Sequence, residues 1–131
     1  LVKSQPDNVT FHGHQTNMDD VWSQIDLLII PSRFEGLPMA ALEAMIRGIP
    51  VLATSVGNLP KLIVHQVNGY LANSESDSET ALVLEQNLSS WMSLTREQRD
   101  SLKNNAIETV KHQYSPQAVV PQLLEIYQLD R

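Results

Sequence analysis

The sequence predicts an α/β fold built on a parallel sheet. Residues 27–30 form an uninterrupted apolar run that ends at Pro31. A run without alternating polar residues is typical of a strand that is buried on both faces, as in parallel sheets. Short apolar runs alternate with helical patterns as far as residue 72, and only helical patterns follow. This order indicates a doubly wound arrangement, in which helices cover both faces of the sheet.

The first half of the chain is expected to contain four strands. Residues 9–12 are rich in β-branched and aromatic side chains and precede a glycine, which predicts the first strand. Asn17 can cap a short helix after it. A second helix is expected to begin at Pro38, because proline is tolerated at the first helical position, and to end at Gly48. The other expected elements are strands at 27–30, 50–54 and 70–72 and a short helix at 61–65.

Three helices are expected after the last strand. The first follows a polar cap at Asp77 or Ser78. Thr95 and Gln98 have the spacing of a capping box, which predicts the start of the second. The Ser-Pro pair at 115–116 predicts the start of the third. We expect the apolar stripe of this last helix to be partly a docking face for another part of the protein; it consists of Val119, Val120, Leu123, Ile126 and Tyr127.

Size and composition exclude several classes of protein. With 131 residues, 42% of them hydrophobic, the chain fits one compact domain. A net charge of −6 argues against nucleic acid as a partner, because phosphate binding needs clustered lysine and arginine. Cysteine is absent and the histidines lack the spacing of metal ligands, so no metal site is expected. No apolar run is long enough to form a transmembrane helix.

The stretch 31–45 has the features of a ligand site. It follows the carboxyl end of the strand at 27–30 and begins a helix, which is where open parallel sheets bind ligands. The first backbone N–H groups of a helix lack partners within it, and the helix dipole adds positive potential, so an anion such as phosphate is favoured there. Gly36 has no Cβ, so a ligand could approach the backbone closely.

Two carboxylates flank this helix start. Glu35 precedes it and Glu43 lies within it. Carboxylates accept hydrogen bonds from sugar hydroxyls, whereas backbone amides bind phosphate, so together they fit a sugar nucleotide. The alternative is that Glu35 only complements the helix dipole and that Glu43 is a solvated surface residue.

The same stretch carries a family resemblance. The motifs are Pro31-Ser32-x-x-Glu35-Gly36-Leu37-Pro38, then Glu43-Ala44-Met45 and Gly48-x-Pro50-Val51. They resemble the signature of retaining glycosyltransferases of family 4, also called group 1, which have the GT-B fold of two Rossmann-like domains facing across a cleft. The likeness extends to Val9-x-Phe11-x-Gly13, Gly57-x-x-Pro60 and Asn68-Gly69. Asn58 and Lys61 depart from the family pattern, which usually has Gly and Glu there.

The resemblance implies that residues 1–131 are part of a C-terminal nucleotide-sugar-binding domain. The N-terminal strands of that domain, its diphosphate-binding Arg and Lys, and the N-terminal acceptor domain would lie outside the chain, which starts at Leu1 rather than at methionine. Glu35 would be the catalytic residue, beside the anomeric centre of the donor sugar. Donor binding would involve Gly13 and His14 beside the base, Glu43 at the ribose, and Ser32, Gly36, Leu37, Pro38 and Met39 along the sugar and diphosphate.

The implied function is transfer of a sugar, with retained configuration, from a nucleotide sugar to a saccharide or lipid-linked acceptor. The resemblance implies no metal or other cofactor. The implied location is cytoplasmic, and peripheral association with the inner membrane face is compatible with it. The isolated piece is expected to be inactive. Two alternatives stay open: a non-catalytic sugar-nucleotide-binding or interaction module, and a sugar-nucleotide epimerase, against which the motif at 32–45 argues.

Overall fold

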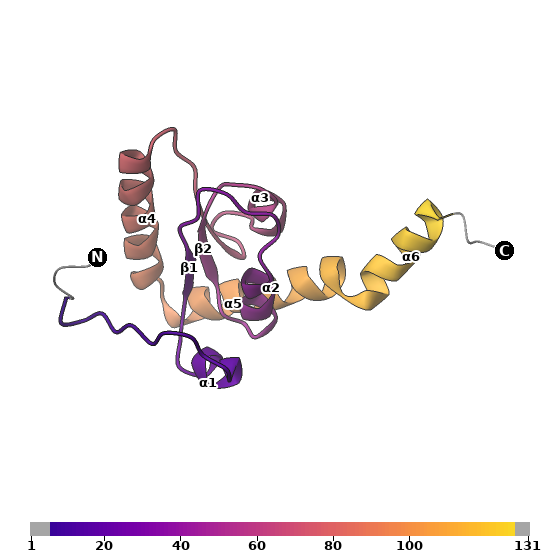
Figure 1. Cartoon of the computed structure of the whole chain (residues 1–131), viewed down its shortest axis with the longest axis horizontal. Helices are drawn as coiled ribbons and strands as arrows, with labels where there is room; N and C mark the ends of the chain where they lie inside the picture. Colours follow the sequence, from indigo (N-terminus) through magenta and orange to yellow (C-terminus); the bar gives the residue numbers. More distant parts are fainter. Residues whose placement is uncertain (1–5, 128–131) are drawn as a thin grey trace.

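Three parallel strands form the sheet of the computed structural model, which describes residues 6–127 (Figure 1). The strands are β1 (Leu28–Ile30), β2 (Val51–Thr54) and β3 (Gly69–Ala72), in that spatial order. Ile29 lies opposite Leu52, and Leu52 lies opposite Tyr70. Helices α2 (Met39–Ile46) and α3 (Leu59–Leu62) connect the strands. The predicted parallel α/β fold is therefore confirmed.

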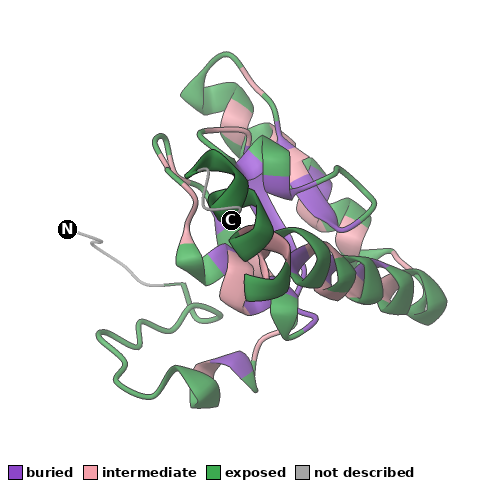
Figure 2. Ribbon diagram, turned by 90° about the vertical axis from the view of Figure 1, so that its right-hand side faces the viewer, coloured by how far each residue is buried: buried purple, intermediate pink, exposed green. Residues whose placement is uncertain are grey.

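Helices pack on both faces of this sheet. Val51 and Ala53 of β2 belong to one buried cluster, to which α2, α3 and the later turns of α5 (Arg96–Tyr114) also contribute. Leu52, between them, belongs to a second cluster with Tyr70, partly covered by α4 (Asp77–Met92). Side chains of successive strand residues point to opposite faces, so the two clusters lie on opposite sides of the sheet. Figure 2 shows the buried residues gathered on the strands and on the helices that face them.

Local capping chemistry starts most of the helices. The Asn17 side chain accepts a hydrogen bond at the start of α1 (Met18–Trp22). Thr95 and Gln98 form the expected capping box of α5. The Ser115 hydroxyl caps α6 (Pro116–Ile126). These contacts satisfy backbone N–H groups that would otherwise lack partners, which is why sequence predicted these starts correctly.

Three helix starts differ by one or two residues from the expectation. Ser76 caps α4, because its hydroxyl accepts from the Glu79 N–H and so places Asp77 in the first turn. Pro38 is the residue before α2 rather than its first residue, because its backbone is extended. Helix α3 begins at Leu59, two residues early, and that side chain is fully buried.

The expected strand at residues 9–12 is wrong. Within the described residues, the sheet ends at β1, and residues 9–12 belong to no strand. Phe11 is 66% exposed. β-branched and aromatic residues favour a strand only where a neighbouring strand receives them, and no strand within residues 6–127 pairs with this segment.

Helix α6 extends away from the rest of the molecule (Figure 1). None of its residues is buried, and Leu123, Ile126 and Tyr127 are exposed. The apolar stripe is therefore not covered by the preceding residues of the described structure, which is the condition that a docking face requires. None of the helices within residues 6–127 has the length and hydropathy needed to cross a membrane.

Candidate functional site

The loop at 31–38 runs from the carboxyl end of β1 to the start of α2 and holds Glu35. The Ser32 hydroxyl donates a hydrogen bond to the Glu35 carboxylate, with 2.6 Å between Oγ and Oε1. Both residues are half-buried. A hydrogen bond to one oxygen of a carboxylate fixes its direction and leaves the other oxygen able to accept from a ligand. Glu35 is thus an oriented hydrogen-bond acceptor at the carboxyl edge of the sheet, which is where open parallel sheets generally bind ligands.

The start of α2 is open toward this loop. Pro38 makes no side-chain capping bond, and the first turn contains no acidic residue. Met39, the first helical residue, is 64% exposed. Free N–H groups and the positive end of the helix dipole can therefore meet an anion. Glu43 follows Met39 by one turn on the same helix face and is half-buried.

A second loop, at 54–58, supports the first. The Thr54 hydroxyl at the end of β2 donates to the Ser32 carbonyl oxygen at 2.5 Å. The Asn58 N–H donates to the Gly36 carbonyl oxygen at 2.9 Å. Gly57 lies between them with a φ of +57°. The site loop is thus held by contacts from another strand and another loop.

A cavity that sequence did not predict adjoins Ser32. It has a volume of about 460 Å³ and lies between the carboxyl ends of the three strands and the start of α4. Arg33 and Asp77 form an exposed ion pair beside it. Hydroxyl groups line it, from Ser32, Thr54, Ser55, Ser74, Ser76 and Thr80. The lining residues come from three separate segments, at 31–33, 54–56 and 72–84, so no local motif could have predicted the cavity.

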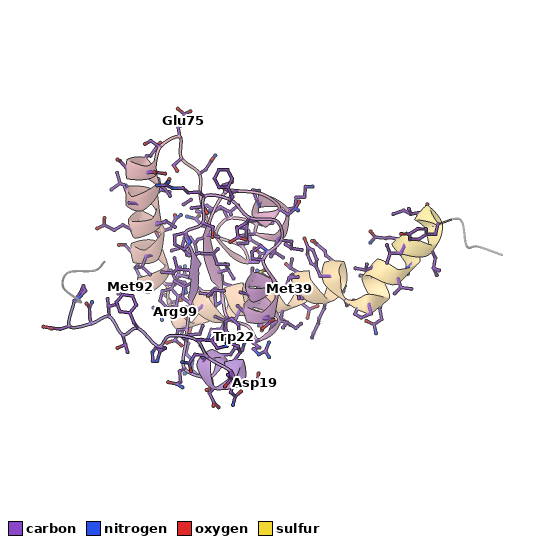
Figure 3. All side chains as sticks on the ribbon, in the orientation of Figure 1. Asp19, Trp22, Met39, Glu75, Met92 and Arg99 are labelled. Atoms are coloured by element: carbon purple, nitrogen blue, oxygen red, sulfur yellow. The ribbon has the colours of Figure 1, made fainter. Side chains whose placement is uncertain are left out.

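Gly13 and His14 are not brought to Glu35. They line a different cavity, of about 670 Å³, together with residues of α1. Figure 3 shows Asp19 and Trp22 of α1 at the opposite end of the sheet from Glu75, which follows β3 at the carboxyl end. Because residues 9–12 form no strand, the sheet does not position this segment. The donor-binding role of Gly13 and His14 stays a prediction.

The other predicted donor-binding residues lie together. Ser32, Gly36, Leu37 and Pro38 follow β1 in one continuous loop, Met39 begins α2 directly after it, and Leu37 packs against the core. Among residues 6–127, no three histidine, aspartate or glutamate side chains are grouped as a metal site would require.

These features define an α/β domain with a carboxylate-bearing loop at the carboxyl edge of its parallel sheet. The family model described as glycosyl transferases group 1 matches residues 3–109. The chain therefore belongs to the glycosyl transferases group 1 family.

Individual relatives agree with this assignment. The lipopolysaccharide core biosynthesis mannosyltransferase LpsB of Rhizobium meliloti is 42% identical over 57 residues, which are 44% of this chain and 16% of LpsB. The C-terminal domain of the group 1 family protein LpcC of Francisella tularensis is 26% identical, with a TM-score of 0.63 over 82% of this chain and 52% of the solved one. The structure thus matches a C-terminal domain of this family.

A more distant likeness supports the fold. Anabaena HepE, solved in complex with UDP-glucose, is 22% identical, with a TM-score of 0.70 over 93% of this chain and 32% of HepE. The chain spans 27% of the length of a curated glycosyltransferase of Methanocaldococcus jannaschii. It is therefore similar to only a part of each of these relatives.

Proposed function

We propose that the full-length protein containing this chain is a retaining glycosyltransferase, and that this chain supplies part of its donor site. The donor is a nucleotide sugar, and the acceptor is a saccharide or a lipid-linked saccharide. The observation that carries the proposal is the Glu35 carboxylate, oriented by Ser32 at 2.6 Å, directly before the uncapped start of α2. A carboxylate can accept hydrogen bonds from the hydroxyls of the sugar, and a helix start favours the phosphates. The two side by side therefore fit a nucleotide sugar.

Each group has a defined task in the proposed reaction. The N–H groups at the start of α2 stabilise the diphosphate as it leaves. Glu35 accepts from the donor sugar near its anomeric carbon, and Glu43 accepts from the ribose hydroxyls. The acceptor oxygen bonds to the anomeric carbon on the face from which the diphosphate departs, and the diphosphate takes the acceptor's proton. Catalysis by this chain is then orientation and electrostatic stabilisation, without a metal or another cofactor.

A donor panel tests the proposal. The full-length protein is incubated with UDP-, GDP- and other nucleotide sugars, and release of the nucleoside diphosphate is measured. We expect one donor to be consumed, and NMR of the product to show the anomeric configuration of the donor. A product of inverted configuration would contradict the retaining mechanism, and a sugar nucleotide converted to its epimer would support the epimerase alternative.

The non-catalytic alternative depends on the diphosphate-binding Arg and Lys, which residues 1–131 do not supply, and on the departure at Lys61. Asn58 also departs from the family pattern. Asn58 contributes its backbone N–H to Gly36, and its φ of −93° does not require glycine. Lys61 is exposed in the last turn of α3, where a positive charge complements the helix dipole. Neither departure disturbs the Glu35 loop, which favours the enzyme. Calorimetric binding of a sugar nucleotide without turnover in the full-length protein would instead support the binding module.

We also propose that the apolar stripe of α6 packs against the remainder of the full-length protein. The proposed location of that protein is the cytoplasm, with peripheral association at the inner membrane face as a variant of it. Leu123→Glu is expected to lower the unfolding temperature of that protein by about 2–4 °C, since the charge would be buried in the contact. Gln122→Glu adds the same charge to an exposed neighbour on the same helix and is the control. Equal unfolding temperatures for the two variants would contradict the docking.

A further inference from the structure

We infer that Thr54 and the turn at Gly57 and Asn58 are positioning residues for the Glu35 carboxylate, an inference that rests on the proposed function. None of the three is expected to touch the donor. Each contacts the backbone of the loop that holds Glu35, and together they set where its carboxylate lies.

Thr54 acts through Ser32. Its side chain is buried, and a β-branched residue in a strand has a restricted χ1, so the hydroxyl direction is well defined. Thr54 Oγ1 lies 2.5 Å from the Ser32 carbonyl oxygen and 3.4 Å from the Ile30 carbonyl oxygen. A hydroxyl has one hydrogen, and the shorter contact takes it. Ser32, held in this way, donates its own hydroxyl to Glu35.

Gly57 acts on the backbone of Glu35 itself. A Cβ at position 57 would lie 1.8 Å from the Glu35 carbonyl oxygen and 2.9 Å from the Gly36 carbonyl oxygen. The next residue, Asn58, donates its N–H to that Gly36 oxygen. Only glycine permits so close an approach at a φ of +57°. The turn therefore packs directly on the main chain at the catalytic position.

The rest of the loop offers little other support. Phe34, beside Glu35, is 91% exposed, and Arg33 is exposed in a surface ion pair. Surface ion pairs contribute little to stability. Apolar packing is supplied farther along, by Leu37. The contacts from residues 54–58 are consequently the main restraint on Glu35, and a small displacement of a catalytic group can lower a rate strongly.

Thr54→Val and Thr54→Ser test the first contact in the full-length protein. Valine keeps the shape and removes the hydroxyl, so kcat is expected to fall about tenfold while the KM for the donor changes little. Serine keeps the hydroxyl and is expected to restore most of kcat. If Thr54 had only a structural role, Thr54→Val would reduce the folded fraction of the protein and leave the kcat of the folded molecules unchanged. Unchanged kcat in a folded Thr54→Val protein, or a serine variant as slow as the valine variant, would overturn the inference.

Gly57→Ala tests the second contact, with Gly48→Ala as its matched control. Gly48 also has a positive φ, of +72°, but a Cβ there would meet side chains alone, the nearest atom being the end of Ile107 at 3.3 Å. Both variants place an alanine at a positive φ, but only Gly57→Ala puts a Cβ against the backbone of Glu35. We expect kcat per folded molecule to fall about tenfold in Gly57→Ala alone. If Thr54→Val fails to fold, the comparison of Gly57→Ala with Gly48→Ala still tests whether this turn positions Glu35. Equal kcat values in these two variants would overturn the inference.

Glu35→Ala separates the inference from the proposed function. If that variant transfers sugar at the wild-type rate, the function proposed for Glu35 is wrong. If it is inactive while folded Thr54→Val and Gly57→Ala proteins keep wild-type kcat, only the positioning is wrong.

Discussion

Replacing Glu35 by alanine is expected to lower the kcat of the full-length protein by about 10²–10³-fold, the usual effect of removing one group that stabilises a transition state. The carboxylate is half-buried and already oriented by the Ser32 hydroxyl. It therefore needs no reorganisation when charge develops at the donor sugar. The measurement is the rate of nucleoside diphosphate release at saturating donor, with circular dichroism to verify folding.

Two further variants make this measurement specific. Glu85→Ala removes the same charge from an exposed position on α4 and is expected to keep wild-type kcat. Glu35→Gln can still accept from Ser32 but has no charge, so it separates electrostatic stabilisation from orientation. We expect Glu35→Gln to be nearly as slow as Glu35→Ala. Wild-type transfer by Glu35→Ala would rule out the proposed role.

The strands that sequence predicted correctly have local signals. β1 follows from an apolar run that ends at Pro31, and β2 follows the Gly48 turn and consists of four buried residues. An unbroken apolar run is recognisable without knowledge of the neighbouring strands. β2 is buried on both faces, whereas β1 is at the edge of the described sheet and its Ile29 is 43% exposed, so the expected burial of residues 27–30 on both faces is wrong. The capping box at Thr95 is similarly local, since donor and acceptor lie three residues apart.

Residues 9–12 show the limit of these signals. Their composition favours a strand, but a strand also needs an edge to pair with, and no local pattern contains that information. The same segment carries Gly13 and His14. Its placement beside α1 separates them from the Glu35 loop, so their predicted role depends on an arrangement that sequence spacing alone does not define.

The site was predictable to the extent that it is continuous in the chain. Glu35 and the start of α2 are neighbours in sequence, and the carboxyl end of a parallel strand is a general place for ligands. The contact of Thr54 with Ser32 spans 22 residues. Sequence singled out Gly57 only as part of the Gly57-x-x-Pro60 motif, and its close approach to the Glu35 carbonyl oxygen depends on the fold.

Replacing Asn68 by alanine is expected to lower the free energy of unfolding by about 3 kcal/mol, through loss of a buried hydrogen-bonded side chain. Sequence singled out Asn68 only as part of the Asn68-Gly69 motif, but this residue is 2% exposed and its side chain contacts residues 62–64 and α5. Its Oδ1 accepts from the Val64 N–H at 2.8 Å, and its Nδ2 lies 3.1 Å from the Leu62 carbonyl oxygen and 2.9 Å from the Thr109 hydroxyl of α5. Chemical denaturation measures the change.

Asn105→Ala is the matched control for this variant. Asn105 also donates its side-chain amide to a backbone carbonyl, that of Val67 at 3.0 Å, but it is exposed. Water can replace that bond, so we expect a loss below about 1 kcal/mol. Asn68→Asp keeps the shape and the acceptor for Val64 but cannot donate to Leu62, so it should be destabilised nearly as much as Asn68→Ala. An equal loss of unfolding free energy in Asn68→Ala and Asn105→Ala would contradict this prediction. It would show that burial does not strengthen the Asn68 hydrogen bonds and that the contact of Asn68 with α5 contributes little to the fold.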